Sequence, residues 1–398
     1  MAGISPGGSG AKNSRWLRLL ALLLGLALVA AACGDDDDTS TDSDDTSAES
    51  DGGDGDGEDA DGDSDAAVSL GDRCDEVADD VAVPEDFSVV LVTDIGKVDD
   101  QTFNQFAYEG LSAAADCFGF ESDFIETASE ADYQTNLATA ASGDPDMIVT
   151  VGFLLAEATL EAAEENPEIN YIGIDQFQET FPANYTGVLF REDEGGCLAG
   201  VAAGLLTETN VVGVVAGRED VPPVVRYANA YEACATQVNP DVTVQIIYNE
   251  AFDTPDKGAQ DAAGMIGDGA DVIFGAGGPT GSAGVVEATK AGAWGIGVDQ
   301  DEYFSTYDGG SAEGADKLAT SAIKRVDLSV FDNIVNLITG DFAGGLFTLT
   351  AENGGITYAP SHDADVPQEV LDALEETRVA LAEGTYDIGV DPITGLPA

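Results

Sequence analysis

The sequence has few cations and almost no histidine. Its 398 residues include 14 Lys and Arg against 76 Asp and Glu, and the single histidine is His362. The formal net charge of −62 excludes nonspecific binding to nucleic acid or anionic lipid head groups, because both repel a polyanion. One histidine argues against Ser-His-Asp or Cys-His catalysis and against a multi-histidine metal site. This composition argues against most enzymes, and we expect no catalytic residues, no metal and no cofactor.

The apolar run at the amino terminus is short. Leu19–Ala32 has 14 residues, too few to span a bilayer comfortably, and three basic residues precede it. Small residues then lead to Cys33, which Gly and four Asp follow; this order resembles a bacterial lipobox, although Ala30 stands where Leu is commoner. We expect residues 1–32 to be a signal peptide and Cys33 to be diacylated, which anchors the protein to the cell membrane outside the cytoplasm. The alternative is ordinary secretion with an incidental cysteine.

An acidic segment follows this cysteine. Residues 34–65 contain 16 Asp and Glu, no Lys or Arg and no aromatic residue. Such a composition buries too little apolar surface to offset the entropy of ordering, and its like charges repel one another. We expect residues 33–87 to form a disordered tether that holds the folded part away from the membrane.

Four further cysteines, Cys74, Cys117, Cys197 and Cys234, allow three pairings if all are bonded in an oxidising compartment. Cys74 precedes the first predicted strand and Cys117 ends the first predicted helix, which favours a bridge between these two. Cys197 and Cys234 lie within helical patterns, where we interpret them as small buried apolar residues.

From Ser88 onward, short apolar runs alternate with amphipathic segments. Such runs are typical of buried parallel strands, so the alternation predicts βαβ units and parallel sheets covered on both faces. One sheet of this length would be unusually wide, and we therefore expect two lobes that divide near residue 209. The predicted strands are Val89–Thr93, Met147–Val151, Tyr171–Ile174, Val211–Ala216, Val242–Tyr248, Val272–Phe274 and Trp294–Val298, and the predicted helices are Phe103–Ala115, Ala156–Glu165, Gly196–Leu206, Val224–Gln237, Gly258–Ile266 and Val285–Ala291.

Three predicted strands are followed by or end in an aspartate, namely Asp94, Asp175 and Asp299. Open α/β sheets bind ligands at the carboxyl ends of their strands, so we expect these carboxylates to face a shared cleft. At any single position, a helix cap or a turn is the alternative. Carboxylates accept hydrogen bonds from hydroxyl and amino groups and repel phosphate, which favours a neutral or cationic polar ligand.

The glycine-rich segment 275–281 follows a strand and precedes a helix. Thr280 occupies the last glycine position of the dinucleotide pattern G-x-G-x-x-G, and the Gly-Lys-Ser/Thr of a P-loop is missing. The segment is therefore either a tight turn or a place where the backbone approaches a ligand closely.

Eight motifs point to a known family. They are LVTDIGKVDDQTFNQFAYEG (91–110), VGFLL (151–155), IGID (172–175), FREDEGGCLAGVAA (190–203), FDTPDKG (252–258), GADVIFGAGGPTG (269–281), IGVDQDEY (296–303) and TSAIKRVD (320–327). In this order they resemble the basic membrane protein family, the lipoprotein substrate-binding components of ABC transporters typified by purine nucleoside receptors. The resemblance covers roughly residues 88–360.

The resemblance implies a type I periplasmic-binding fold of the α/β class. In this fold, two Rossmann-like lobes with parallel sheets are joined by three hinge crossovers and close on the ligand. We expect the N-terminal lobe at 88–209, the C-terminal lobe at 210–324, a helix returning to the N-terminal lobe at 325–344, and the completion of the C-terminal lobe, with a final helix, at 345–398.

The resemblance also implies a binding site. Family members sandwich a purine between two aromatic rings, and Phe103 and Phe274 stand at the matching motifs, with core packing as the alternative for each. The remaining expected ligand-binding residues are Asn104 and Asp175 at the base edge, Asp299, Gly277, Gly278 and Lys324 near the ribose, and Asp94 and Asp100, which line the pocket or cap the first helix.

These observations predict an extracytoplasmic lipoprotein that captures a purine nucleoside or similar riboside and delivers it to an ABC permease and its ATPase. The alternatives are a ligand-sensing lipoprotein not coupled to transport, a receptor for another flat ring such as riboflavin, and an enzyme acting on nucleosides. The enzyme is disfavoured, because no nucleophile–base constellation is visible in the sequence.

Overall fold

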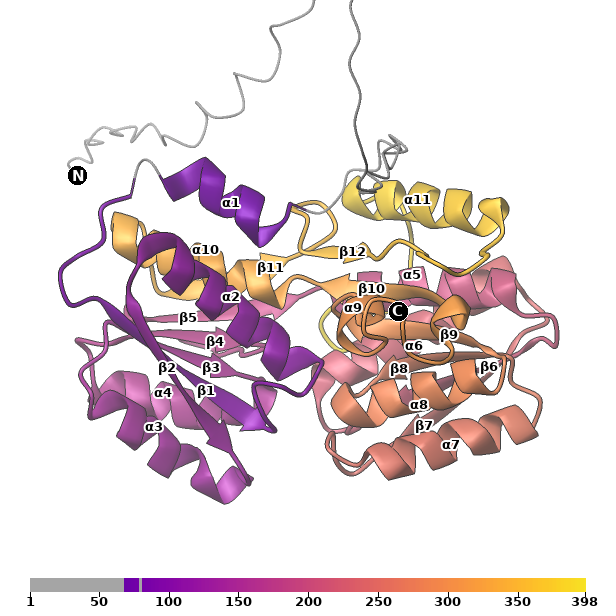
Figure 1. Cartoon of the computed structure of the whole chain (residues 1–398), viewed down its shortest axis with the longest axis horizontal. Coiled ribbons are helices and arrows are strands. Elements are labelled where there is room, and N and C mark those ends of the chain that lie inside the picture. Colours follow the sequence, from indigo (N-terminus) through magenta and orange to yellow (C-terminus); the bar gives the residue numbers. More distant parts are fainter. Residues whose placement is uncertain (1–67, 79–80) are drawn as a thin grey trace, which may run out of the picture. The chain divides into compact units, whose positions relative to one another are not determined.

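Figure 1 shows a computed structural model, which describes residues 68–78 and 81–398. The predicted signal peptide, the lipidation site Cys33 and the acidic segment 34–65 lie outside the described residues. Within these, the chain forms two six-stranded sheets with helices packed on both faces. No helix of this part of the chain is long and apolar enough to cross a membrane.

The N-terminal lobe is built on a sheet of parallel strands. Its elements are β1 (Ser88–Ile95), α2 (Phe103–Phe118), β2 (Glu121–Thr127), η3 (Glu130–Asp132), α3 (Tyr133–Ala141), β3 (Met147–Val151), η4 (Phe153–Leu155), α4 (Ala156–Glu165), β4 (Asn170–Ile174), β5 (Tyr185–Phe190), α10 (Val326–Thr339) and β11 (Gly345–Leu349). The strand order is β11-β5-β4-β3-β1-β2. Along β3, Val149 packs on the face covered by α2 and α10, and Ile148 packs on the face covered by α3 and α4. Both faces are buried, which explains the continuous apolar runs.

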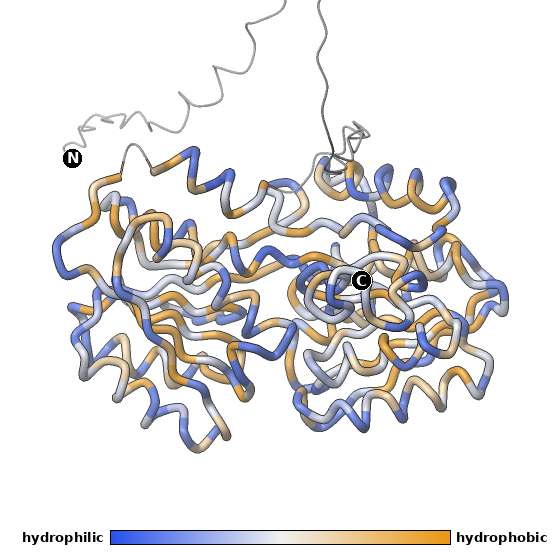
Figure 2. Tube along the Cα trace, viewed as in Figure 1, coloured by the Kyte–Doolittle hydropathy of each residue, from blue (hydrophilic) through white to orange (hydrophobic). Residues whose placement is uncertain are grey.

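The C-terminal lobe repeats this plan. Its elements are α5 (Glu192–Leu206), β6 (Val211–Ala216), α6 (Pro222–Val238), β7 (Thr243–Tyr248), α7 (Pro255–Gly267), β8 (Val272–Ala276), α8 (Gly278–Lys290), β9 (Trp294–Asp299), α9 (Glu302–Ser305), η5 (Ala315–Lys317), β10 (Leu318–Lys324), β12 (Ile356–Tyr358) and α11 (Gln368–Ala382). The strand order is β12-β10-β9-β8-β6-β7, and only the β10–β12 pair is antiparallel. Apolar residues concentrate along the strands of both sheets, and polar residues recur in the loops (Figure 2).

The chain passes between the lobes three times, after β5, after β10 and after β11. Two sheets of this kind joined by three crossovers confirm the predicted fold class. The structure places the first crossover near residue 191 rather than 209, because α5 packs against α6 and α11 of the C-terminal lobe. It also places β11 beside β5 in the N-terminal sheet, although we expected residues 345–398 in the other lobe. Periodicity predicts a helix or a strand, but not which of two sheets the element joins.

The folded part begins before residue 88, so the expected tether is too long at its carboxyl end. Helix α1 spans Leu70–Val77, and the side chain of its N-cap Ser69 accepts a hydrogen bond from the N–H of Asp72. A disulfide between Cys74 and Cys117 joins α1 to α2 and confirms the predicted bridge.

The interpretation of Cys197 and Cys234 as unpaired buried residues is wrong, because the two form a disulfide between α5 and α6. Glycines allow these helices to approach closely. A Cβ at Gly200 of α5 would lie 2.3 Å from the carbonyl oxygen of Tyr231 on α6. The short distance between the two backbones brings the cysteines together, and the periodicity of either helix alone does not reveal it.

Candidate functional site

A cavity of about 750 Å³, its open mouth included, lies between the two lobes. Its lining includes residues at the carboxyl ends of β1, β4, β8, β9 and β10, so strands of both sheets end at it. Open parallel sheets bind ligands at this edge.

Nine of the ten predicted ligand-binding residues line this cavity, and one does not. Phe274 is completely buried in the core, where its ring stacks on Tyr231 at a centroid distance of 5.4 Å and meets Tyr227 edge-on at 5.9 Å. Its side chain packs against these two tyrosines of α6, whereas Ala276, the last residue of β8, and the turn after it line the cavity. The nine lining residues are Asp94, Asp100, Phe103, Asn104, Asp175, Gly277, Gly278, Asp299 and Lys324.

A different aromatic residue of the C-terminal lobe lines the cavity. Phe252 belongs to the motif FDTPDKG, which was the signal in the sequence that could have identified it. Gly217 leaves room for its ring, since a Cβ there would lie 2.2 Å from the Cε1 of Phe252. Phe103 enters the cavity from α2 of the N-terminal lobe, so the two lobes each contribute a phenylalanine. Phe153 and Tyr227 complete the aromatic lining.

A buried chain of ion pairs supports one end of the cavity. The ammonium of Lys324 contacts Asp175 Oδ2 at 2.6 Å and Glu192 Oε1 at 3.0 Å, and Glu192 Oε2 accepts from Arg226 Nε at 2.7 Å. Burial disfavours the charge on Lys324, but the nearby carboxylates outweigh it and raise the pKa of this ammonium. Burial also raises the pKa of Asp175 to about 6, against the opposing effect of Lys324. At neutral pH this network therefore holds two cations and two carboxylates.

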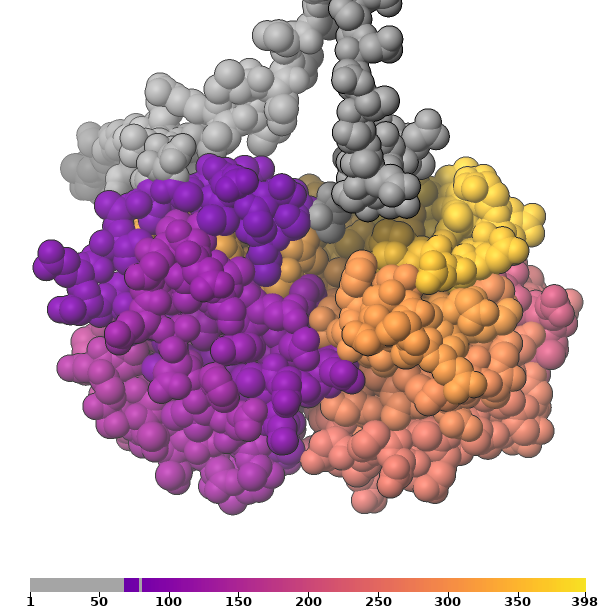
Figure 3. Space-filling model, viewed as in Figure 1, coloured from indigo at the N-terminus to yellow at the C-terminus, as the bar shows by residue number. Residues whose placement is uncertain are grey.

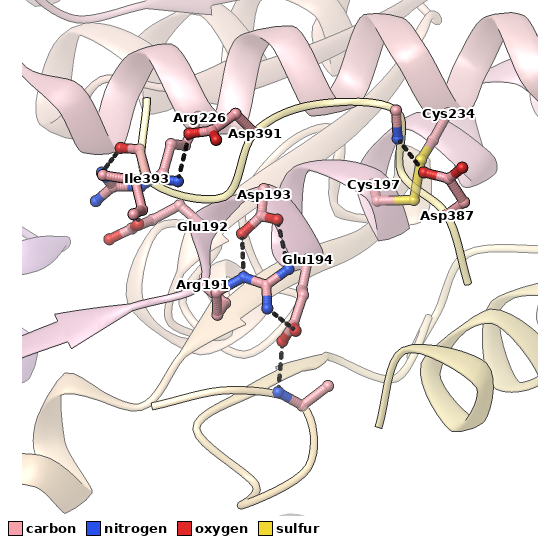
Figure 4. Close-up of polar contacts among 12 residues, drawn as sticks. Arg191, Glu192, Asp193, Glu194, Cys197, Arg226, Cys234, Asp387, Asp391 and Ile393 are labelled. Atoms are coloured by element: carbon pink, nitrogen blue, oxygen red, sulfur yellow. Dashed lines mark hydrogen bonds and ion pairs between the residues drawn. A yellow bond between two sulfur atoms is a disulfide. The ribbon is translucent and has the colours of Figure 1, made fainter. Parts of the chain in front are cut away.

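The network also links the crossovers. Arg191, in the first crossover, pairs with Asp193 at 2.7 Å and with Glu194 at 3.2 Å, and Glu194 Oε2 accepts the N–H of Ala351 in the third crossover at 2.6 Å (Figure 4). Burial raises the pKa of Glu194 to about 7. The second crossover begins at Lys324, which Glu192 holds. The first turn of α5 thus joins all three connections between the lobes.

Asp299 and Asp94 line the cavity from opposite lobes. Burial raises the pKa of Asp299 to about 7, and no hydrogen bond reaches its carboxylate from the part of the chain that the structure describes. Asp94 has a pKa raised by burial to about 6, and its carboxylate accepts hydrogen bonds from the Tyr133 hydroxyl and the Ile95 N–H. Gly152, at a φ of 102°, makes room for it, because a Cβ there would lie 2.2 Å from Asp94 Oδ2.

Asp100 performs both of the roles considered for it. It lines the cavity, and its carboxylate caps α2 by accepting the N–H groups of Thr102 at 2.9 Å and Gln105 at 3.0 Å. It also accepts the side-chain amide of Asn104 at 3.0 Å, while the Asn104 carbonyl oxygen accepts the Asp94 N–H at 3.2 Å. Asn104 is therefore held in one orientation at the cavity wall.

The lobes touch across the cleft (Figure 3). Arg218, after β6, pairs with Glu130 of the N-terminal lobe at 2.6 Å. Gln300, after β9, donates a hydrogen bond to the backbone oxygen of Thr102 at 3.3 Å. These two contacts join the lobes beside the cavity, as expected of the closed form of a two-lobed fold.

Comparison with known proteins identifies the family. Residues 87–384 match the Bmp family model, described as ABC transporter substrate-binding protein PnrA-like. The chain belongs to the Bmp family. It is 33% identical over 338 residues to the CD4+ T-cell-stimulating antigen of Listeria innocua, covering 80% of this chain and 92% of that protein. It is 32% identical over 326 residues to the ABC transporter nucleoside-binding protein BmpA of Lactococcus lactis, covering 77% and 90%.

Solved structures agree with this assignment. An ABC transporter solute-binding protein from Aeropyrum pernix superposes with a TM-score of 0.63 at 28% identity, covering 78% of this chain and 84% of that one. The predicted family and fold are thus confirmed. This Bmp protein is a substrate-binding protein of an ABC transporter and belongs to a family of extracytoplasmic solute-binding proteins rather than enzymes. Its family implies a small-molecule ligand and permease subunits as partners.

Proposed function

We propose that this Bmp protein binds a purine nucleoside, or a similar riboside, between its lobes and delivers it to the permease. The observation that carries the proposal is the pair Phe103 and Phe252, which reach one cavity from opposite lobes. A flat base buries both of its faces against two such rings, and stacking adds to the gain from burial. Because each lobe supplies one ring, the sandwich is complete only when the lobes close.

The polar lining fits a neutral, hydroxyl-rich ligand. Asp175, Asp299 and Asp94 supply acceptors, whereas the cation of this lining, Lys324, already pairs with Asp175 and Glu192. An anionic phosphate would meet this excess of carboxylates, so nucleosides are favoured over nucleotides. Asn104, held by Asp100, presents an amide edge suited to the donor and acceptor groups of a base. The name of the Lactococcus lactis relative, a nucleoside-binding protein, supports the same ligand class.

The lipid anchor belongs to this proposal as well. Its support is the order of basic residues, apolar run and Cys33 in the sequence. Two acyl chains on Cys33 would hold the protein at the membrane face where a permease receives its ligand. Mass spectrometry of the protein from membranes of its native host should find Cys33 as a diacylated first residue, and an unmodified first residue at any other position contradicts the anchor.

The ligand is tested by thermal unfolding. The chain from residue 33 onward, with Cys33→Ser, is heated with inosine, guanosine, adenosine, free purines, ribose, glucose, riboflavin or an amino acid mixture. Binding to the folded state alone at about 100 times the Kd should raise the midpoint by about 2–4 °C. A rise with purine nucleosides supports the proposal, and a rise only with another class removes the ligand assignment.

Variants test the stacking. Phe103→Leu and Phe252→Leu keep an apolar side chain but remove the ring, and each should weaken nucleoside binding in calorimetry by about tenfold. Phe304→Leu is the control, because Phe304 is exposed and lies outside this cavity. Equal affinity of all three variants and the parent chain contradicts the sandwich.

A further inference from the structure

A side chain of the C-terminal lobe contacts the start of the helix that carries Phe103. Gln300 follows Asp299 directly, and its Nε2 donates a hydrogen bond across the cleft to the backbone oxygen of Thr102 at 3.3 Å. We propose that Gln300 is a positioning residue for ligand binding, which latches the lobes closed and fixes the Phe103 ring relative to Asp299. This role rests on the proposed binding of a ligand between the lobes, and it adds a residue that does not touch the ligand.

The two lobes carry the same four-residue turn at matching places. The sequence reads Gly-Ile-Asp-Gln at 173–176 and Gly-Val-Asp-Gln at 297–300, at the ends of β4 and β9, and each of these is the third strand in the order of its sheet. Asp175 and Asp299 both have a left-handed backbone, with φ of 62° and 66°, and both line the cavity. The glutamines that follow them are both buried. From this repeat alone, the two glutamines would be expected to have the same partners.

The glutamine of the N-terminal lobe bonds within its own lobe. The Nε2 of Gln176 donates to the backbone oxygen of Gly152 at 3.0 Å, and its Oε1 accepts from the Tyr185 hydroxyl at 2.6 Å. Its amide fills the space over Gly173, where a Cβ would lie 2.6 Å from the amide carbon. Gln176 therefore braces a single lobe.

In the C-terminal lobe another residue fills the matching space. A Cβ at Gly297 would lie 2.8 Å from the carboxyl carbon of Glu302. The side chain of Gln300 does not occupy this space and crosses the cleft to Thr102 instead. It also stays out of the ligand cavity: Asp299 lines that cavity, whereas Gln300 lines a second hollow that residues of both lobes surround. An effect of Gln300 on binding must therefore pass through the position of the lobes.

The other end of the latch is a buried helix start. Thr102 is completely buried, and its backbone oxygen also accepts the Phe106 N–H at 2.9 Å. A second segment of the C-terminal lobe approaches the same residue, because a Cβ at Gly278 would lie 3.8 Å from Thr102 Oγ1 and 3.5 Å from the Cβ of Phe252. Two segments of one lobe thus meet the residue that precedes Phe103. Separating the lobes here breaks the hydrogen bond, so the bond favours the closed form.

The variant Gln300→Met removes the donor and keeps an unbranched side chain of similar length. The backbone oxygen of Thr102 keeps its bond with the Phe106 N–H, so no buried carbonyl is left unpaired. Loss of one such hydrogen bond should lower the ratio of closed to open lobes by about fivefold. A bound ligand should then dissociate about five times faster, while its association rate stays within about twofold.

Nitroxide labels measure the ratio of closed to open lobes without a ligand. Cysteines that carry the labels replace Ala138 on α3 and Ala263 on α7, which are exposed and lie on different lobes, in the chain from residue 33 onward with Cys33→Ser. Pulsed electron paramagnetic resonance gives the distances between the labels, and the population at the distance seen in the structure is the closed form. Gln300→Met should lower the ratio of closed to open lobes by about fivefold. Gln176→Met is the matched control and should change it by less than about twofold, because its bonds stay within one lobe.

Thermal unfolding of the ligand-free chains separates the latch from a structural role. Gln176→Met loses buried bonds and leaves the Tyr185 hydroxyl without its acceptor, so its midpoint should fall by at least about 2 °C. Gln300→Met loses a bond of the closed form alone, and its midpoint should fall by less than about 1 °C.

Stopped-flow measures the effect on the ligand. The probe is inosine, guanosine or adenosine, whichever binds most tightly, followed by its 2′-deoxy form; if no nucleoside binds, the probe is the compound of another class that raises the unfolding midpoint. Gln300→Met should speed the dissociation of each probe by about fivefold, because the side chain touches none of them. An effect on the ribonucleoside without an effect on its deoxy form would mean a direct contact and would overturn the positioning role.

The latch is also overturned if Gln300→Met has the closed-to-open ratio of the parent chain, or if Gln176→Met changes this ratio as much. A fall in the midpoint of Gln300→Met as large as that of Gln176→Met would assign it a structural role instead. Failure of the proposed function looks different: the parent chain would bind no nucleoside, while the label distances would still respond to Gln300→Met.

Discussion

Replacing Glu302 with glutamine should remove a pH-dependent loss of stability. Glu302 is completely buried at the start of α9, directly after the turn that carries Asp299. Its Oε1 accepts hydrogen bonds from the Ser282 hydroxyl at 2.9 Å and from the Val298 N–H at 3.2 Å. No cation of the described residues pairs with it, and burial raises its pKa from 4.5 to about 7.

The size and sign of the effect follow from linkage. Because the folded-state pKa lies above the unfolded one, the folded chain holds a proton between pH 4.5 and 7 that the unfolded chain has released. The free energy of unfolding therefore falls as the pH rises through this window and stays low above it. At about 1.4 kcal/mol per pKa unit, the whole effect is about 3 kcal/mol, of which about 2.5 kcal/mol appears between pH 5 and 8.

Urea unfolding followed by circular dichroism at pH 5 and pH 8 measures this effect. Subtracting the parent chain's free energy of unfolding from that of Glu302→Gln removes the contribution of the titrating groups that both chains share. Relative to the parent chain, the free energy of unfolding of the variant should be about 2.5 kcal/mol higher at pH 8 than at pH 5, because glutamine keeps the acceptor and does not ionise. For Glu376→Gln, at an exposed position of α11, the same difference should be less than about 0.5 kcal/mol. A Glu302→Gln difference that is equal at both pH values, or smaller at pH 8, would show that Glu302 does not carry this pH dependence.

Two other contacts, an ion pair across the cleft and a disulfide, can be tested by substitution. Glu130→Gln removes the partner of Arg218 across the cleft. In stopped-flow experiments at low salt, inosine, or the purine nucleoside that binds most tightly, should therefore dissociate about 2–5 times faster from the variant than from the parent chain. The difference should vanish at high salt, which screens the ion pair. Equal rates at low salt would mean that the pair does not hold the lobes closed. The variant Cys197→Ala/Cys234→Ala loses a bridge across a separation of 37 residues and should lose about 3–4 kcal/mol of unfolding free energy in urea. A loss below about 1 kcal/mol would show that the packing of α5 on α6 suffices.

The strands that the sequence predicts well are the central ones. Met147–Val151 and Val211–Ala216 form strands with the predicted bounds, because strands covered on both faces must be apolar throughout. Glu121–Thr127 was not predicted. It lies at the edge of its sheet, and most of its side chains are exposed and polar. Leu318–Lys324 is completely buried but rich in small and polar residues, so its composition does not resemble a core strand.

The site is predictable where it depends on the ends of strands. Asp175 and Asp299 line the cavity because they stand where parallel strands finish, a position that the sequence shows directly. Phe274 was misplaced, because it stands two residues before the end of β8 and its side chain packs against α6 in the core. Tyr227 and Arg226 were not predicted, because the inward face of α6 depends on its packing against α5.

A crystal structure of the chain from residue 33 onward, with Cys33→Ser, grown with inosine, guanosine or adenosine, tests the proposed ligand most directly. We expect density for the nucleoside between the lobes, with the base between the rings of Phe103 and Phe252 and the sugar beside Asp299. A nucleoside bound elsewhere, or a base that touches neither ring, would contradict it.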